Sequence, residues 1–179
     1  MSGPLPRARA PFLRLYGAFF ALALVAVLGV QWLALPVFFP QWHAGDGLLV
    51  GGDWLLHHER ARALAEAIAA EGWHVWALRP EGQAPAGIAA AVYALTLPEP
   101  WTLAPLNAAL HAAGALALVY LLGQLGLPWR WAVVAALPFF LYPSAMLWYT
   151  QILKDTYSVP GFLVFVCGWV ALVRWRGAW

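Results

Sequence analysis

Residues 15–39 read LYGAFFALALVAVLGVQWLALPVFF, an apolar run in which Tyr16 and Gln31 are the main polar interruptions. A helix needs about 20 apolar residues to cross the hydrocarbon core of a bilayer, and this run is long enough. Further segments that meet or approach this length lie at residues 101–122, 129–149 and 159–173. The sequence therefore predicts an all-α polytopic membrane protein with about four transmembrane helices.

The composition excludes several other classes of protein. Of the 179 residues, 63% are hydrophobic and 10% are charged, and the mean hydropathy is +0.70. Soluble domains carry about 25% charged residues, so a soluble enzyme, a disordered chain and a disulfide-rich scaffold are all excluded. The net charge of +2 gives no basis for nucleic-acid binding. The single cysteine, Cys167, lies in an apolar run without a disulfide or metal-binding motif.

The basic residues predict the orientation of the chain in the membrane. With the N-terminus in the cytoplasm, the cytoplasmic face receives Arg7, Arg9, Arg14, Arg130, Arg174 and Arg176. The extracytoplasmic face then receives all eight acidic residues, together with Arg60, Arg62, Arg79 and Lys154. We expect a protein of the cytoplasmic (inner) membrane. Its first span is expected to be an uncleaved anchor, because it exceeds the roughly 7–15 apolar residues of a signal peptide.

Residues 40–100 are expected to form a long extracytoplasmic loop that is the working part of the protein. Residues 57–71 (HHERARALAEAIAAE) predict a helix with one apolar face, and Gly72 predicts its end. Residues 87–97 (GIAAAVYALTL) are too few to span a bilayer, and predict a helix in the membrane interface or against the bundle.

Two carboxylates near the start of this loop are candidates for catalysis. Asp46 and Asp53 lie among four glycines in HAGDGLLVGGDWLLHHERA, residues 43–61. A carboxylate at this position can deprotonate a hydroxyl group or help to coordinate a divalent cation. The structural alternatives are a helix N-cap for Asp53 and a turn residue for Asp46.

Cationic residues at the same face are candidates for binding phosphate. Lys154 and Asp155 end the string YTQILKD between the third and fourth spans. Lys154 can bind a phosphate as a point charge, or the pair can simply mark a solvated helix end. Residues 79–82 (RPEG) predict a turn, from which Arg79 can also meet a phosphate.

Polar residues inside the spans have a structural explanation. Asn107 and His111 are four residues apart, so they share one helix face and are expected to form interhelical hydrogen bonds. Pro138 and Pro143 are expected to kink the third span. The adjacent His57 and His58 make a poor metal-binding pair, because neighbouring residues on a helix point in different directions.

Four segments in order carry a family resemblance: GGDWLLHHERA, WALRPEGQAPAGIAAAVYAL, LNAALHAAGALALVYLLGQLG and LPFFLYPSAMLWYTQILKD. From about residue 12 to residue 173, the chain resembles the N-terminal part of the polyprenyl-phosphate-dependent GT-C glycosyltransferases. This group includes the protein mannosyltransferases and the lipid A aminoarabinose transferases. The resemblance implies a GT-C-like fold, and sugar transfer from a polyprenyl-phosphate donor to an acceptor on the extracytoplasmic face.

The resemblance also implies roles for individual residues. The essential acid of the first outer loop maps to Asp53, which precedes His58 at similar spacing, or else to Asp46. We therefore expect Asp53→Asn to abolish transfer. Lys154 would meet the lipid phosphate, and Asp155 would hold Lys154 or a metal ion such as Mg²⁺ or Mn²⁺. The expected substrate-binding residues are Lys154, Asp155, Arg79 and His58.

Other classes of function remain as alternatives. Members of the group usually have more spans, so the chain is expected to be either an N-terminal portion of a longer enzyme or a small relative that lacks the remainder. A non-catalytic scaffold or a degenerate relative is the second hypothesis, and a transporter component is the third. An enzyme requires Asp46 or Asp53 to converge with Lys154 on one cavity, whereas in a scaffold these residues can lie apart.

Overall fold

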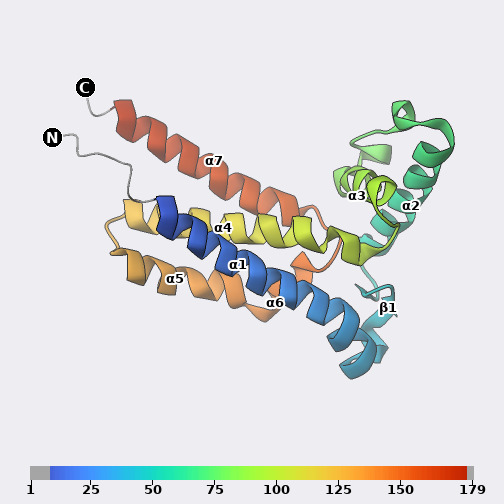
Figure 1. Cartoon of the computed structure of the whole chain (residues 1–179), viewed down its shortest axis with the longest axis horizontal. Coiled ribbons are helices and arrows are strands. Elements are labelled where there is room, and N and C mark those ends of the chain that lie inside the picture. Colours follow the sequence, from blue (N-terminus) through green and yellow to red (C-terminus); the bar gives the residue numbers. More distant parts are fainter. Residues whose placement is uncertain (1–8, 177–179) are drawn as a thin grey trace.

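The computed structural model describes the backbone of residues 9–176 and the side chains of residues 11–174. Its helices form an elongated bundle with a smaller layer at one end (Figure 1). The bundle contains α1 (Arg9–Gly29), a π-helical continuation (Val30–Phe38), α4 (Ala104–Gln124), α5 (Trp129–Leu141), α6 (Pro143–Tyr149) and α7 (Asp155–Arg176). The end layer contains β1 (His43–Gly45), β2 (Leu48–Leu49), α2 (Asp53–Glu71) and α3 (Ala84–Leu95). Short 3₁₀ turns lie at Pro40–Trp42, Trp73–Val75, Pro80–Gly82 and Pro100–Leu103.

Three helical stretches in the described part of the chain are long and apolar enough to cross a membrane: Pro11–Phe38, Pro100–Gln124 and Asp155–Arg174. α5 and α6 together form a fourth apolar segment, bent by 65°. The bend falls at Tyr142, whose extended backbone is the conformation favoured before a proline such as Pro143. These elements confirm a mostly helical protein with three or four candidate spans. The last helix begins at Asp155, four residues before the predicted start of the fourth span.

The bundle core is built from small residues that allow the helices to approach closely. Ala108, Ala112 and Ala115 of α4 are fully buried. They pack with Phe19 of α1 and Phe140 of α5, whose ring centroids are 4.6 Å apart. α4 is therefore the central helix, in contact with α1, α5 and α7.

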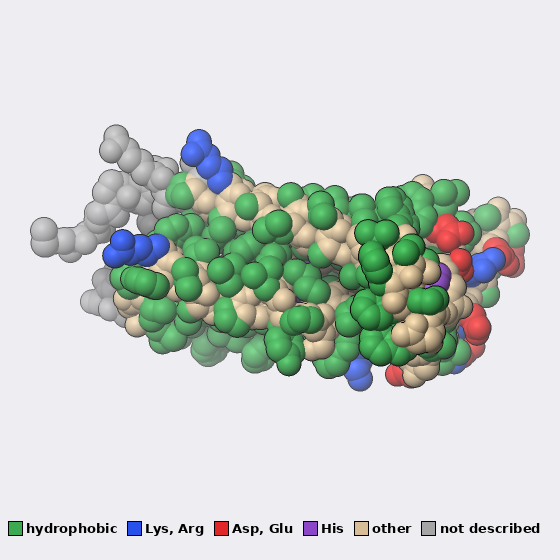
Figure 2. Space-filling model, turned by 90° about the horizontal axis from the view of Figure 1, so that it is seen from below, with side chains coloured by type: hydrophobic (Ala, Val, Ile, Leu, Met, Phe, Trp, Pro, Cys, Tyr) green, Lys and Arg blue, Asp and Glu red, His purple; other side chains and the backbone are tan. Residues whose placement is uncertain are grey.

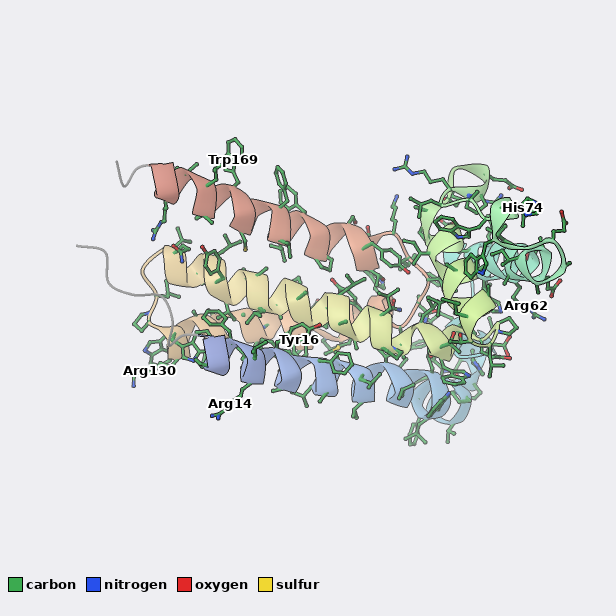
Figure 3. All side chains as sticks on the ribbon, turned by 45° about the horizontal axis from the view of Figure 1, so that its top comes forward. Arg14, Tyr16, Arg62, His74, Arg130 and Trp169 are labelled. Atoms are coloured by element: carbon green, nitrogen blue, oxygen red, sulfur yellow. The ribbon has the colours of Figure 1, made fainter. Side chains whose placement is uncertain are left out.

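The surface of the bundle is apolar along its length, and its charges lie near its ends (Figure 2). Asp and Glu side chains gather at the end that carries α2 and α3, whereas Arg14 and Arg130 lie at the opposite end (Figure 3). Arg7 and the side chains of Arg9 and Arg176 lie outside the described residues. The charges are thus divided as the sequence predicts, while the end that faces the cytoplasm stays a prediction.

The end layer differs from its predicted form in two respects. α2 begins at Asp53, four residues before the predicted start, and ends as expected at Gly72, where φ is 101°. α3 packs on α2 through a cluster of buried residues: Ala61, Ala65, Ala89, Ala90 and Tyr93. The pairing of α3 with α2 is not predicted by the sequence. The same buried cluster also contains Leu103 and Ile152 at the end of the bundle, in agreement with the predicted placement against the bundle, while a place in the membrane interface stays a prediction.

Candidate functional site

The hairpin of β1 and β2 presents Asp46 at its tip. Gly45 pairs with Leu48, which leaves Asp46 and Gly47 as a two-residue loop. Their φ angles are 52° and 75°. A type I′ turn requires positive φ at both central residues, and Asp-Gly is one of its favoured dipeptides. The turn role of Asp46 is therefore confirmed, and its exposed carboxylate projects from a fixed backbone.

Gly47 brings the hairpin against the bundle. A Cβ atom at this position would lie 2.6 Å from the Cβ of Gln31, in the π-helical continuation of α1. The Gly47 N–H also donates to Nε2 of His43 at 3.0 Å. Position 47 therefore requires glycine for two reasons: its backbone has a positive φ, and a larger side chain would overlap Gln31.

Two buried glutamines fasten the hairpin to the loop between α6 and α7. The Oε1 of Gln151 accepts the Leu49 N–H at 3.0 Å, and its Nε2 donates to the Gly47 carbonyl at 3.4 Å. The same Nε2 lies 2.7 Å from Thr150 Oγ1. The Nε2 of Gln31 donates to the Thr150 carbonyl at 2.6 Å. Neither glutamine is among the site residues predicted from the sequence, although a polar residue within or beside an apolar span is a signal for function.

His58 connects Asp46 to the end layer. Its Nδ1 is 2.9 Å from the Tyr93 hydroxyl, and its Nε2 is 3.8 Å from Oδ2 of Asp46. A carboxylate facing Nε2 favours a proton on that nitrogen, which leaves Nδ1 to accept the hydrogen bond from Tyr93. The three side chains form a chain that runs from the exposed carboxylate into the buried contact between α2 and α3.

Burial and nearby carboxylates shift the pKa values of His58 and Tyr93. Burial lowers the pKa of His58, while the nearby Asp46 carboxylate raises it. Burial raises the pKa of Tyr93, and the Glu99 and Asp46 carboxylates raise it further. His58 is therefore mainly neutral and Tyr93 protonated near pH 7.

A cavity of about 400 Å³ opens beside Asp46. Its lining consists of Gln31, Trp32, Pro36, His43, Asp46, Gly47, Glu99 and Trp101. The lining holds two carboxylates and no lysine or arginine. We call this space the acidic cavity.

His57 lies in a second electrostatic group. Burial lowers the pKa of its imidazole, the Asp53 carboxylate raises it, and the Arg60 and Lys154 cations lower it. Asp53 and Lys154 are thus within electrostatic reach of one histidine, yet neither lines the acidic cavity. Three of the predicted site residues therefore fall into two groups: Asp46 lies near His58, whereas Asp53 and Lys154 lie near His57.

The remaining predicted site residues lie at helix ends and turns, where Asp53 and Arg79 are exposed and Asp155 is partly buried. Gly52, and not Asp53, is the N-cap of α2, and Asp53 is the exposed first residue of the helix. Asp155 lies in the first turn of α7, where a negative charge complements the helix dipole. The structure does not pair it with Lys154.

Arg79 is exposed beside the predicted turn, in which Glu81 has a φ of 49°.

The polar residues of α4 stabilise the broken helix formed by α5 and α6. The Nδ2 of Asn107 donates to the Tyr149 carbonyl at 2.9 Å. The Nε2 of His111 lies 3.0 Å from the Phe140 carbonyl, just before the bend. The predicted interhelical hydrogen bonds are confirmed, and they satisfy carbonyl groups at the ends of the two short helices.

The family resemblance implies a divalent cation such as Mg²⁺ or Mn²⁺, and its ligands can be sought among the described residues. Among them, no group of three or more His, Cys, Asp or Glu side chains is placed to hold a metal ion. We therefore assign no step of the chemistry to a metal.

No protein-family model, curated protein or solved structure matches this chain. The functional interpretation therefore depends on the residues themselves and on the geometry described above.

Proposed function

We propose that this chain is a membrane glycosyltransferase, or the N-terminal part of one. It transfers a sugar from a polyprenyl-phosphate donor to an acceptor at the end of the bundle that carries α2 and α3. The main support is the contact of Asp46 with His58, at the edge of a cavity beside the apolar bundle. The family resemblance of the sequence supports the same reaction.

The chemistry needs a base and a positive charge. Asp46 accepts the proton of an acceptor hydroxyl as the acceptor oxygen forms its bond to the anomeric carbon. The bond between that carbon and the phosphate oxygen breaks, and the polyprenyl phosphate leaves as an anion. The family resemblance assigns the electrostatic stabilisation of this anion to Lys154, which lies within electrostatic reach of His57. The Glu99 carboxylate, in the same cavity as Asp46, favours an oxocarbenium-like transition state.

The proposed location is the cytoplasmic (inner) membrane, with the N-terminus in the cytoplasm. The separation of charges supports this orientation: the acidic residues gather at the α2 end, and Arg14 and Arg130 lie at the other. Basic residues favour the cytoplasmic face, so the acidic cavity would open on the extracytoplasmic face.

A non-catalytic scaffold is the second candidate function. The observation in its favour is that Lys154 and Asp53 do not line the acidic cavity with Asp46. A scaffold does not require Asp46 and Lys154 to lie in one cavity. The enzyme requires the donor to reach from Asp46 at its sugar to Lys154 at its phosphate.

The test is a transfer assay on the full chain in proteoliposomes, with radiolabelled polyprenyl-phosphate mannose and aminoarabinose as donors. The readout is release of polyprenyl phosphate in the presence of a bacterial membrane lipid extract. Loss of a general base lowers the rate by about 10²–10⁴-fold, so Asp46→Asn should lose at least about 100-fold. Glu66→Gln, on the exposed face of α2, is the matched control and should retain the wild-type rate.

The same assay separates the competing hypotheses. If Asp53→Asn alone loses the activity, the base role moves from Asp46 to Asp53. A wild-type chain that releases no polyprenyl phosphate from either donor contradicts transfer by this chain alone and favours the scaffold.

A further inference from the structure

A second cavity adjoins the acidic one beside the first candidate span. It has a volume of about 460 Å³. Its lining is mostly apolar and consists of Leu24, Leu28, Trp32, Thr96, Leu97, Trp101, Thr102, Ala104 and Pro105. Leu24 and Leu28 belong to the first candidate span, so this space lies beside lipid. We call it the apolar cavity.

Two tryptophans are common to both cavities. Trp32 and Trp101 line the acidic cavity and the apolar cavity alike, and their ring centroids are 5.8 Å apart at an interplanar angle of 60°. The two cavities are therefore neighbours on either side of the indole pair, and a molecule with a polar head and an apolar tail that lies across the two rings can contact both. Tryptophan suits this boundary, since its ring is apolar and its N–H is a hydrogen-bond donor.

The lining of the acidic cavity defines the head of such a molecule. Asp46 and Glu99 repel an anionic phosphate, and no lysine or arginine of the lining offsets them. Both carboxylates can accept hydrogen bonds from hydroxyl groups.

An unpartnered buried amide is a second, independent indication of a ligand with donor groups. Gln31 is only 3% exposed and lines the acidic cavity, and its Oε1 has no hydrogen-bond partner among the described residues. An unsatisfied buried acceptor is costly, so a donor from a ligand is favoured there.

We propose that the acidic and apolar cavities form one binding site for an amphiphile with an uncharged sugar headgroup and an apolar tail. The headgroup hydroxyls donate to Asp46, Glu99 and Gln31, and the tail lies between α1 and the start of α4. That this amphiphile is the acceptor of sugar transfer rests on the proposed function, whereas its binding does not.

The experiment is photolabelling of the full chain in lipid nanodiscs. The probes are a decyl glucoside, a decyl phosphate and a decylammonium, each with the same diazirine at the tail end. Labelled residues are mapped by mass spectrometry. The glucoside should label the segments at 24–28 and 96–105, and excess unlabelled decyl glucoside should compete.

Variants then test the headgroup contacts. Asp46→Asn combined with Glu99→Gln weakens these hydrogen bonds and should lower the glucoside labelling of these segments by about tenfold. The control, Glu66→Gln combined with Glu71→Gln on exposed positions of α2, should leave the labelling unchanged. Thermal unfolding of each variant confirms that the fold is retained.

Three results would overturn the proposal. Equal labelling of these segments by all three probes would mean general partitioning from the bilayer. Stronger labelling by the phosphate or the ammonium probe would assign a charged headgroup. Glucoside labelling that survives in the Asp46 and Glu99 variant, with its fold intact, would remove the carboxylates from the site. Glucoside labelling without sugar transfer would instead keep the binding site and contradict only the proposed function.

Discussion

At the level of single residues, the position of Asp46 depends on the glycine that follows it. Gly47 has a φ of 75°, and a Cβ atom there would overlap Gln31. Gly51 has a similar φ of 81°, but a Cβ atom there would meet nothing within 4 Å. Alanine substitutions at the two positions therefore distinguish the cost of backbone strain, which both carry, from the cost of steric overlap, which only Gly47→Ala carries.

We expect Gly47→Ala to destabilise the protein more than Gly51→Ala does. Strain and overpacking together should lower the free energy of unfolding by about 2–4 kcal/mol for Gly47→Ala. Strain alone should cost about 1–2 kcal/mol for Gly51→Ala. The measurement is thermal unfolding in detergent, and equal losses of stability would contradict the close contact between the hairpin and Gln31.

The buried histidines predict a dependence of stability on pH. Burial lowers the pKa of both His57 and His58 below the ordinary value of 6.5. The unfolded chain therefore binds more protons than the folded chain as pH falls through 6.5, and stability falls with it. The stability contributed by the neutral imidazoles is present above that pH and is lost below it.

We accordingly expect a lower unfolding temperature at pH 5 than at pH 7.5. The His57→Gln and His58→Gln double variant should show a shallower slope over this range, whatever its absolute stability. His74→Gln is the control, because His74 is exposed on the 3₁₀ turn after α2. A double variant with the wild-type slope would contradict the assignment of this dependence to the buried pair.

At the level of elements, a two-stranded hairpin has little stability of its own, and hydrogen bonds from the bundle hold it. Gln151 is fully buried and contacts both Leu49 and Gly47 of the hairpin. This side chain joins the loop that presents Asp46 to the loop that presents Lys154.

Gln151→Ala should release the hairpin. It leaves the Leu49 N–H and the Gly47 carbonyl without their side-chain partner, at about 1–3 kcal/mol for each group. Hydrogen exchange at residues 43–49 should become faster, while Gln41→Ala, at an exposed glutamine near the hairpin, should leave it unchanged. Unaltered protection in Gln151→Ala would show that the hairpin is held by other contacts.

The sequence predicts the helices well, because their apolar patterns are long. The break of the third span follows from Pro143, and the end of α2 follows from Gly72. The helix starts at Asp53 and Asp155 are earlier than expected, because acidic first-turn residues extend both helices beyond their apolar part. The sequence predicts a turn at Asp46 as one alternative, but it does not predict the two short strands that flank it, although Asp-Gly is a favoured dipeptide of hairpin turns.

The composition of the site could be predicted only in part. Asp46, Asp53 and Lys154 are rare charged residues in an apolar chain, so the sequence singles them out. Their grouping is a tertiary property, since it depends on what His57 and His58 meet in the different directions in which they leave α2. Glu99 and Trp101 reach the acidic cavity from a turn more than fifty residues away in sequence, and no local pattern indicates that contact.

At the level of the whole molecule, an apolar bundle separates two charged ends (Figure 2). The end layer of α2 and α3 lies at one end of the bundle and packs around a buried cluster that also contains Leu103 and Ile152 of the bundle end. The hairpin and the α6–α7 loop join this layer to the helices. The acidic cavity therefore lies at the acidic end of the bundle, beside the first candidate span.

The central claim is that this acidic end is the extracytoplasmic working end. It is tested by labelling intact cells with a membrane-impermeant maleimide, in a Cys167→Ser background with Glu66→Cys or Arg130→Cys as the single cysteine. We expect labelling of Glu66→Cys in intact cells, and of Arg130→Cys only after the cells are made permeable. Labelling of Arg130→Cys in intact cells, with Glu66→Cys protected, would contradict the account.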